Sequence, residues 1–494
     1  MDFLDPKKKR AHTIRLYLGY ALVAIAIGIG AFVLLYAAYG YGVDRSGNVF
    51  QNGLMFLAST PDGAETNISS TTNTFKQQAT TSARLVLPAD EYNVEMLKQG
   101  YRTWSRTVPL KGGQVERLVY PFLFPETLVT KDQQLYSTQP GLTTASPDRR
   151  WIVVQSPTEF NAFDVFDTSS PDAVAQRIAV PASLFAPTAT SQQLQLVEWS
   201  TDNRHILVRY VHDNTTEFLM LDRESPQNSI NINQHMGVTA SNIMLRDKSA
   251  EKLYMQLPDG QLINANTKDK TTSPLLSNVV TFWPHGDDTI AYISNKDLAN
   301  TGVVSVQILS AGTSYQLRTL PNSPSYLIDL AQYNGHWYVA AGATNDQHVY
   351  VYRDPVETLQ RNDPESVLTT RTLRISNPQK LSFSNNAQFI AVQSGQQFVV
   401  YDAEADRQYR YEIPDAFEPG ALATWMDGHR LTSVSGGKVI VFDFDGSNKQ
   451  LLNAIVANGK PMFDRDYTLL YAIAPSVDVS GRFALTRTDL RVKN

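Results

Sequence analysis

The chain has 494 residues, enough for two to four domains, since one domain takes roughly 100 to 200 residues. Its 42% hydrophobic content excludes bulk disorder, and its 18% charged content is below the usual figure of about 25%. The sequence contains no cysteine, which excludes disulfides, thiol nucleophiles, cysteine-ligated zinc and iron–sulfur clusters.

Residues 16–41 are the first predicted element, a single transmembrane helix in contact with the lipid bilayer. The run from Leu16 to Tyr39 contains 24 residues without a charged side chain. About 20 apolar residues suffice to cross a hydrocarbon core of roughly 30 Å. The alternative is a cleaved signal peptide, whose apolar region is only about 7 to 15 residues long. The length therefore favours a retained anchor.

Residues 1–15 form a basic tail with five Lys or Arg and two Asp. The positive-inside rule predicts that this tail is cytoplasmic and that the rest of a single-pass cell-membrane protein is extracytoplasmic. Removing the tail from the totals of 43 basic and 48 acidic residues leaves 38 and 46, a net charge of −8 with neutral histidine. Such a surface lacks the basic patch that nucleic-acid binding needs, so nucleic acid is excluded as a partner.

Residues 49–120 are predicted to form a small β-sandwich. Three apolar runs bounded by turn residues read as strands, at Gly53–Ser59, Ala83–Leu87 and Tyr92–Leu97. Between the first two, residues 59–82 carry 11 Ser or Thr out of 24. We expect this segment to be a mobile polar loop, because it offers little apolar surface to bury.

The turns of this segment carry a resemblance to a known family. Pro61-Asp62-Gly63-Ala64, Leu87-Pro88, Tyr92-Asn93-Val94 and Lys98-Gln99-Gly100-Tyr101 follow one another as in PEGA domains, and residues 49–120 resemble that family. The match departs from the family pattern at Ala89 and lacks the middle hairpin of the family. The resemblance implies an extracytoplasmic accessory module, similar to those on bacterial and archaeal envelope proteins, without catalytic residues.

Residues 127–494 contain a repeated polar turn followed by an apolar strand. The turns are centred on residues 148, 202, 247, 287, 334, 385, 427 and 466, about 45 residues apart on average. This spacing is typical of four-stranded propeller blades and predicts a β-propeller of eight blades, with seven as the alternative. Each apolar strand is expected to precede an outer strand, such as 163–167, 218–222 or 398–402. Residues 127–137 are expected to complete the last blade.

The repeated turn also resembles a family pattern. Ser146-Pro147-Asp148 and the strand ending in Asp402 are similar to the WD-like repeats of TolB-type propellers, whereas the paired Gly-His and Trp-Asp of true WD repeats are absent. The resemblance implies a rigid disk that binds other macromolecules.

A search for catalytic and metal-binding motifs finds weak candidates only. There is no Gly-x-Ser-x-Gly elbow and no His-Glu-x-x-His motif. His205, His285 and His429 lie at blade turns and could meet on one face, although structural hydrogen bonding is the favoured interpretation. The remaining histidines are scattered, at positions 12, 212, 235, 336 and 348.

Three further groups of residues have a chemical and a structural interpretation. Asp443, Asp445 and Gly446 resemble part of a calcium loop but are expected to form a hairpin turn. Asp287-Asp288 and the pair Asp164 and Asp167 could be glycosidase acids but are expected to be solvated. Trp151, Trp199, Trp283, Trp337 and Trp425 could stack on sugars, although packing between blades is favoured. We therefore predict no catalytic, cofactor or metal site and no enzyme activity.

The helix and the repeats predict a membrane-anchored extracytoplasmic binding or scaffolding protein. The resemblances to PEGA domains and TolB-type propellers imply that it belongs to a prokaryotic cell envelope and binds an envelope protein or glycan. The long polar segments 171–195 and 354–370 between blades favour a protein partner. Two alternatives stay open: an enzyme acting on carbohydrate in the propeller pocket, and an envelope sensor that signals through the helix.

Overall fold

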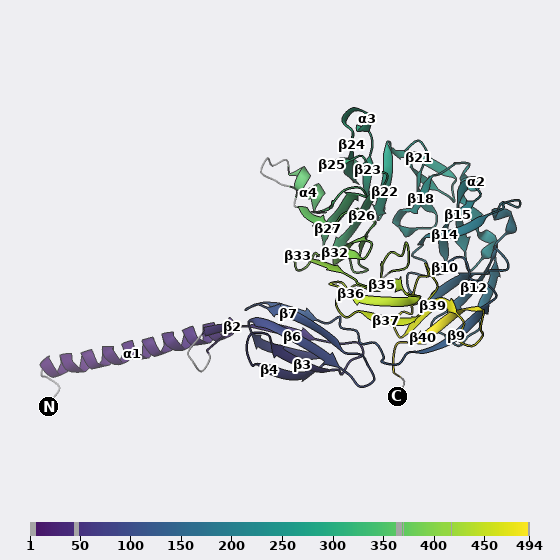
Figure 1. Ribbon diagram of the computed structural model, residues 1–494. Helices are drawn as coiled ribbons and strands as arrows, with labels where there is room; N and C mark the ends of the chain where they lie inside the picture. The colour runs from purple at the N-terminus through teal and green to yellow at the C-terminus, as the bar shows by residue number, and fades with distance from the viewer. Residues whose placement is uncertain (1–5, 44–48, 362–367, 369, 416, 493–494) are drawn as a thin grey trace. The chain divides into compact units, whose positions relative to one another are not determined.

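The computed structural model describes residues 6–43, 49–361, 368, 370–415 and 417–492 (Figure 1). The chain divides into two compact units, residues 1–127 and residues 128–494. Apart from a long N-terminal helix and a few short helical turns, the described residues are strands and their connections. The protein is therefore an all-β protein behind one N-terminal helix.

The N-terminal helix α1 spans Pro6–Ala38. Its segment Lys9–Ala38 has 30 residues and contains an 18-residue window of mean hydropathy 2.5, in which no residue is buried within the protein. A helix of this length extends about 45 Å, longer than a hydrocarbon core. The helix ends before the predicted residue 41, because Gly40 adopts a φ of 79° and residues from Tyr41 onward turn into a strand.

Two four-stranded sheets pack face to face in the rest of the first unit. One sheet contains β1 (Tyr41–Val43), β2 (Val49–Leu57), β5 (Ala83–Pro88) and β8 (Val115–Leu118). The other contains β3 (Glu65–Ser70), β4 (Lys76–Thr80), β6 (Asp90–Leu97) and β7 (Trp104–Leu110). Alternate side chains such as Met55, Leu87, Val94 and Trp104 are buried between the sheets. The predicted β-sandwich is therefore confirmed.

The predicted polar loop at residues 59–82 is wrong, because this segment contains the hairpin of β3 and β4. Strand β3 lies between β4 and β6, with Ile68 opposite both Gln77 and Val94. Thr66 and Ile68 are buried, while Asn67 between them is half-buried and Glu65 is exposed. Threonine has a high strand propensity, so a Thr-rich segment with a few buried positions suffices for a strand on one face of the sandwich.

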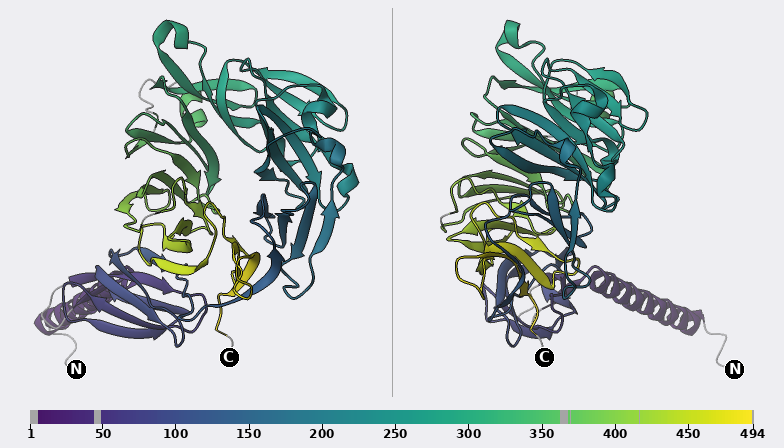
Figure 2. Two further views of the ribbon diagram at one scale, coloured as in Figure 1. Left: turned by 45° about the vertical axis from the view of Figure 1, so that its right-hand side comes forward. Right: turned by 90° about the vertical axis from the view of Figure 1, so that its right-hand side faces the viewer.

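The second unit consists of eight antiparallel four-stranded sheets within the described residues, and Figure 2 shows them following one another around a ring. The first strands of successive sheets, such as β22, β26 and β30, lie next to one another. They line the axis, and the later strands of each sheet extend outward. This arrangement is a β-propeller, and the predicted count of eight blades is confirmed.

The strands of the first four blades are β10 (Thr143–Ala145), β11 (Trp151–Gln155), β12 (Ala162–Asp167) and β13 (Gln176–Ala179); β14 (Gln192–Trp199), β15 (His205–His212), β16 (Thr215–Asp222) and β17 (Ile230–Asn231); β18 (Asn242–Leu245), β19 (Lys252–Gln256), β20 (Leu262–Asn266) and β21 (Thr271–Leu276); and β22 (Val279–His285), β23 (Thr289–Ser294), β24 (Val303–Ser310) and β25 (Thr313–Pro321). Those of the next three are β26 (Tyr326–Tyr333), β27 (His336–Ala343), β28 (His348–Arg353) and β29 (Thr370–Arg374); β30 (Lys380–Phe383), β31 (Phe389–Ser394), β32 (Gln397–Asp402) and β33 (Arg407–Glu412); and β34 (Thr424–Trp425), β35 (Arg430–Ser435), β36 (Lys438–Asp443) and β37 (Gln450–Ala454).

The eighth blade joins the two ends of the second unit. It contains β38 (Met462–Phe463), β39 (Leu469–Pro475), β40 (Phe483–Asp489) and, as its outermost strand, β9 (Val129–Tyr136). Strand β9 pairs antiparallel with β40, with Tyr136 opposite Phe483. The eighth blade also packs on the first, where Tyr136 and Leu485 share a core with Ile152. The predicted completion of the last blade by residues 127–137 is thus confirmed.

All eight predicted turn centres lie between the first and second strands of their blades. Several of these turns contain a residue with positive φ, such as Asn203 at 56°, Asp247 at 52° and Asn334 at 47°. Asparagine, aspartate and glycine adopt this conformation at low energy, which explains why the turns recur as polar patterns in the sequence.

The strands predicted as outer strands are in fact the third of four. Residues 163–167 lie in β12, 218–222 in β16 and 398–402 in β32, and nearly all their side chains are buried. The outermost strands are polar, as in β33, where exposed residues alternate with half-buried ones. An outermost strand contacts the core through one face only, so it lacks the continuous apolar run that the prediction relied on.

Short helical segments occur in the connections: η1 (Ala182–Leu184), η2 (Pro226–Asn228), α2 (Ile232–Met236), η3 (Arg246–Lys248), α3 (Leu298–Thr301) and α4 (Pro355–Gln360). The predicted loop 171–195 is not one continuous loop, because it includes β13, η1 and the start of β14. In the predicted loop 354–370, residues 355–360 form α4, and residues 362–367 and 369 are outside the described residues.

Candidate functional site

The three turn histidines singled out in the sequence have separate structural partners. His205 Nδ1 lies 2.5 Å from Asp202 Oδ2 in its own turn. The rings of His285 and Trp337 are nearly perpendicular, with their centroids 4.9 Å apart. Burial lowers the pKa of His285. His429 packs against Phe389 at 5.6 Å. No group of three His, Asp or Glu residues suited to a metal ion occurs among the described residues.

The other histidines of the propeller also have local partners. His212 lies 3.4 Å from Glu217, His235 lies 2.8 Å from the carbonyl oxygen of Thr267, His336 lies 2.7 Å from Asp354 and His348 lies 3.6 Å from Asp346. His12 is exposed on α1. These contacts agree with the structural interpretation.

The candidate carboxylate pairs are engaged by arginines and hydroxyls. Asp167 pairs with Arg150 at 2.9 Å, Asp164 with Arg177 at 3.4 Å and Asp287 with Arg246 at 2.7 Å. Asp288 accepts a hydrogen bond from Thr289 Oγ1 at 3.1 Å. Asp164 is buried, contrary to the expectation that these acids face solvent.

The segment of Asp443, Asp445 and Gly446 forms the predicted hairpin turn between β36 and β37. The amide of Gly446 donates to the carbonyl oxygen of Asp443 at 2.8 Å. Asp445 Oδ1 accepts from the amide of Ser447 at 3.1 Å. Both contacts close the turn on itself, as expected for a hairpin.

Four of the five tryptophans reach a neighbouring blade, as predicted. Trp199 Nε1 donates to Thr144 Oγ1 at 2.9 Å, Trp425 Nε1 donates to Ser382 Oγ at 3.2 Å, Arg223 lies 4.0 Å from the ring of Trp151, and Trp337 contacts His285. Trp283 on β22 is instead 39% exposed, so the prediction of core packing is wrong for this residue.

A cavity of about 290 Å³ lies between blades six, seven and eight. Lys380 at the start of β30 provides one wall, and the segments 420–422 and 458–461, which lead into blades seven and eight, provide others. Strands β34 and β35 form the floor with Thr424, Thr432 and Val434. Three consecutive blades thus contribute to one cavity.

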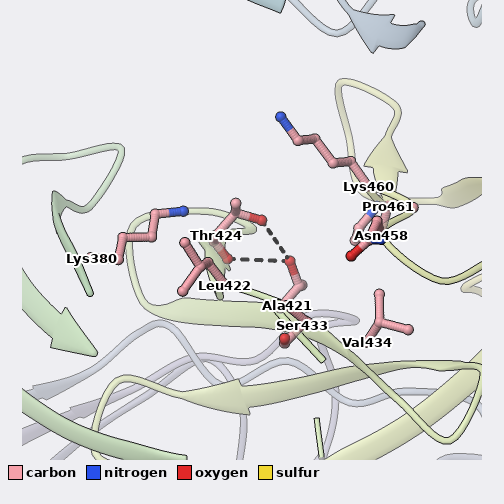
Figure 3. A pocket seen from close by; sticks show the side chains of 12 residues that line it. Lys380, Ala421, Leu422, Thr424, Ser433, Val434, Asn458, Lys460 and Pro461 are labelled. Carbon is pink, nitrogen blue, oxygen red and sulfur yellow. Dashed lines mark hydrogen bonds between the residues drawn. The ribbon is translucent and has the colours of Figure 1, made fainter. Parts of the chain in front are cut away.

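Two lysines dominate the chemistry of this cavity. In Figure 3 the side chains of Lys380 and Lys460 approach the space around Thr424 from two sides. No aspartate or glutamate is among the described residues that line the cavity. Burial, with the nearby charge of Lys460, lowers the pKa of Lys380 to about 8. The cavity therefore holds positive charge that no carboxylate in its lining balances.

Hydroxyl and apolar groups complete the lining. Thr424 Oγ1 and Thr432 Oγ1 are hydrogen bonded at 3.2 Å, and Thr432 Oγ1 also lies 3.2 Å from the carbonyl oxygen of Thr424 (Figure 3). Leu422, Val434 and Pro461 add an apolar surface. A cavity with a few convergent polar groups and an apolar wall is typical of small-molecule binding sites.

The sequence analysis did not select any residue of this cavity. Lys380 and Lys460 are 80 positions apart and belong to no recognisable motif. The signal that could have indicated Lys380 is its position in the repeat. It begins the first strand of its blade, and the first strands line the axis. A search for histidines and paired acids excluded lysine from the start.

Comparisons with known proteins add no family assignment. No family model matches the chain, and no curated protein matches it. Solved structures with a similar fold include the C-terminal WD40 domain of Sif2, with 11% identity, 74% of this chain and 99% of that chain covered, and a TM-score of 0.46. The Dos1 propeller is 13% identical, with 74% of this chain and 96% of that chain covered and a TM-score of 0.44. An oligogalacturonate lyase from Vibrio parahaemolyticus is 8% identical, with 73% of this chain and 99% of that chain covered and a TM-score of 0.37. At these values the similarity concerns the fold alone. The four-stranded sheets of the second unit and the apolar helix α1 themselves show that the chain is a β-propeller protein with an apolar N-terminal helix.

Proposed function

We propose that this protein is a membrane-anchored binding or scaffolding protein of a prokaryotic cell envelope. Residues 1–15 are the cytoplasmic tail, residues 16–41 contain the membrane span, residues 49–120 are a PEGA-like module outside the membrane, and residues 127–494 are the recognition domain. The propeller binds an envelope protein or glycan without chemical conversion.

The observation that carries this proposal is the uncovered apolar helix joined to a β-propeller. The apolar window of α1 has no buried residue, although burying apolar surface is the main driving force of folding. A bilayer would cover it. Lys9, Arg10 and Arg15 lie at the N-terminal end of the helix, which supports a cytoplasmic N-terminus by the positive-inside rule.

The propeller suits recognition, because its surface loops are fixed by packed blades. Eight sheets closed by β9 leave little conformational freedom to lose on binding. Anchoring the domain to a membrane raises its effective concentration near partners in the same envelope.

Protease accessibility tests the topology. Spheroplasts that express the full chain, tagged at either end, are treated with trypsin before and after lysis. We expect the C-terminal tag to be lost from intact spheroplasts and the N-terminal tag to survive until lysis. A C-terminal tag that survives in intact spheroplasts contradicts the proposed orientation.

Crosslinked pull-downs test the recognition role. Full-length protein is compared with a chain that lacks residues 127–494, and captured proteins are identified by mass spectrometry. Partners lost with the propeller support recognition by that domain. An unchanged set of partners contradicts it.

A further inference from the structure

We propose that the cavity between blades six, seven and eight binds a small organic anion, with its carboxylate or phosphate between Lys380 and Lys460 and its organic part against Leu422, Val434 and Pro461. The inference rests on the proposed function as a binding protein and specifies the chemistry of one ligand.

The first argument is charge. Two ammonium groups, those of the half-buried Lys380 and the exposed Lys460, line one cavity whose described lining contains no acid, although a lysine removed from water is usually paired with a carboxylate. Lys380 is half-buried, so its charge is partly removed from water. An anion between the two lysines would replace the lost solvation and offset their mutual repulsion.

The second argument is the neighbouring hydrogen-bonding group. Thr432 has one hydroxyl proton, which it can donate to the carbonyl oxygen of Thr424. The proton of Thr424 Oγ1 is then donated to Thr432 Oγ1, a neutral acceptor at 3.2 Å, and it can turn instead to an anionic oxygen close to the Lys380 side chain (Figure 3). A hydroxyl donor beside ammonium groups binds carboxylate and phosphate oxygens through charge-assisted hydrogen bonds.

The third argument is size and polarity. A cavity of about 290 Å³ is close to the lower end of the volumes typical of ligand sites, roughly 300 to 1,000 Å³. Leu422, 41% exposed, and the half-buried Pro461 offer apolar surface that a bare inorganic ion would leave wet, whereas Val434 lines the cavity but is only 3% exposed. The cavity is therefore better filled by an anion with an organic body than by a simple ion.

Competitive labelling of lysines tests this inference on the full-length protein in detergent. Trace isotope-labelled acetic anhydride is added at pH 8 with potassium chloride, inorganic phosphate, acetate or butyrate at equal ionic strength, and labelling of each lysine is measured by mass spectrometry. We expect phosphate or butyrate to slow labelling of Lys380 at least fivefold relative to chloride. Lys268, exposed in another blade, serves as the internal reference.

Matched variants make the result specific. Lys460→Met should raise the anion concentration that protects Lys380 at least tenfold, whereas Lys131→Met, at an exposed position on the outermost strand β9, should leave it unchanged. Unaltered labelling of the other lysines reports that the variants fold. Protection by butyrate alone assigns a carboxylate ligand, and protection by phosphate alone assigns a phosphate ligand.

Two outcomes overturn the inference: no anion slows Lys380 more than Lys268, or Lys460→Met leaves the protection unchanged. Labelling in detergent does not depend on membrane orientation or on a protein partner. Its failure would therefore remove the anion site without affecting the proposed function, and the protease and pull-down experiments test that function separately.

Discussion

The carboxylate of Asp329 in β26 accepts a hydrogen bond from the backbone amide of Phe383 in β30, at 3.2 Å, and so joins the first strands of blades five and six. Its other oxygen accepts from the amide of Leu330 at 2.8 Å. Burial raises the pKa of Asp329 to about 7, and these two hydrogen bonds lower it only in part.

Asp329 should therefore make stability depend on pH. The folded chain retains a proton that the unfolded chain releases near pH 4. The free energy of unfolding should therefore fall as the pH rises from about 4 to about 7. The loss should be at most about 4 kcal/mol, at about 1.4 kcal/mol for each unit of pKa. Asp329→Asn should flatten this part of the profile, as measured by urea unfolding from pH 4 to 8.5.

Asp329→Asn also removes one acceptor oxygen, which lowers the free energy of unfolding by the same amount at every pH. The slope of the free energy of unfolding against pH therefore reports the titration of Asp329. Asp466→Asn, at an exposed position in a blade turn, is the control and should keep the wild-type slope. An Asp329→Asn profile parallel to that of the wild type would show that Asp329 is already ionised in the folded protein.

A second prediction concerns the strand that closes the ring. Asp132 in β9 accepts hydrogen bonds from the amides of Val477 at 3.1 Å and Asp478 at 3.2 Å, and from the hydroxyl of Ser476. Asp132→Ala removes these hydrogen bonds, and since water can reach the two exposed amides it should lower the free energy of unfolding by about 0.5–1.5 kcal/mol in guanidinium titrations.

The neighbouring Lys131 on β9 provides the matched control, because its side chain is exposed. Lys131→Ala should change stability by less than about 0.5 kcal/mol. Equal changes in the free energy of unfolding for the two substitutions would argue that the Asp132 hydrogen bonds do not stabilise the pairing of β9 in the eighth blade.

A third prediction compares a buried and an exposed ion pair. Arg430 Nε donates to Asp427 Oδ2 at 2.9 Å, and both residues are buried in the turn of blade seven. Arg430→Met leaves a buried carboxylate without its cation and should lower the free energy of unfolding by about 3–5 kcal/mol. The double variant Asp427→Ala with Arg430→Met should recover part of this loss, as measured in a double-mutant cycle.

The pair of Arg371 and Asp406 is the exposed counterpart, with side chains 41% and 53% accessible. Arg371→Met should lower stability by less than about 1 kcal/mol, since solvent screens this pair. A loss as large as that of Arg430→Met would contradict the role assigned to burial.

A fourth prediction concerns the hairpin that replaces the expected loop. Amide protons of β3, paired on both sides, should exchange far more slowly than those of residues 71–74 in its turn. Asp90 accepts from Ser70 Oγ at 2.6 Å and Asn73 Nδ2 at 2.8 Å. Asp90→Ala should speed exchange in the turn and leave β3 protected, as measured by hydrogen–deuterium exchange with mass spectrometry.

Asn93→Ala is the control, because Asn93 is exposed on the same strand as Asp90. It should alter neither segment. Rapid exchange throughout residues 65–80 of the unaltered protein would instead restore the interpretation of this segment as a mobile loop.

The sequence predicted those parts of the fold that depend on local chemistry. The blade turns were found because positive φ at residues such as Asn203 and Asn334 requires particular residue types. The outermost strands other than β9 were missed, and so was β3, since one buried face in a polar strand leaves a weak pattern. The lysine cavity was missed for another reason: Lys380 and Lys460 meet only when three blades are placed around the axis.

The pairing of β9 with β40 also has a consequence for biosynthesis. Tyr136 leaves the ribosome or translocon well before its partner Phe483, so β9 must stay unpaired while about 350 residues follow. The ring closes only after β40 has been synthesised. A chain truncated before residue 483 would keep β9 unpaired as an exposed strand edge, which promotes aggregation and proteolysis. Truncated chains should therefore be removed more readily than chains in which β9 pairs with β40.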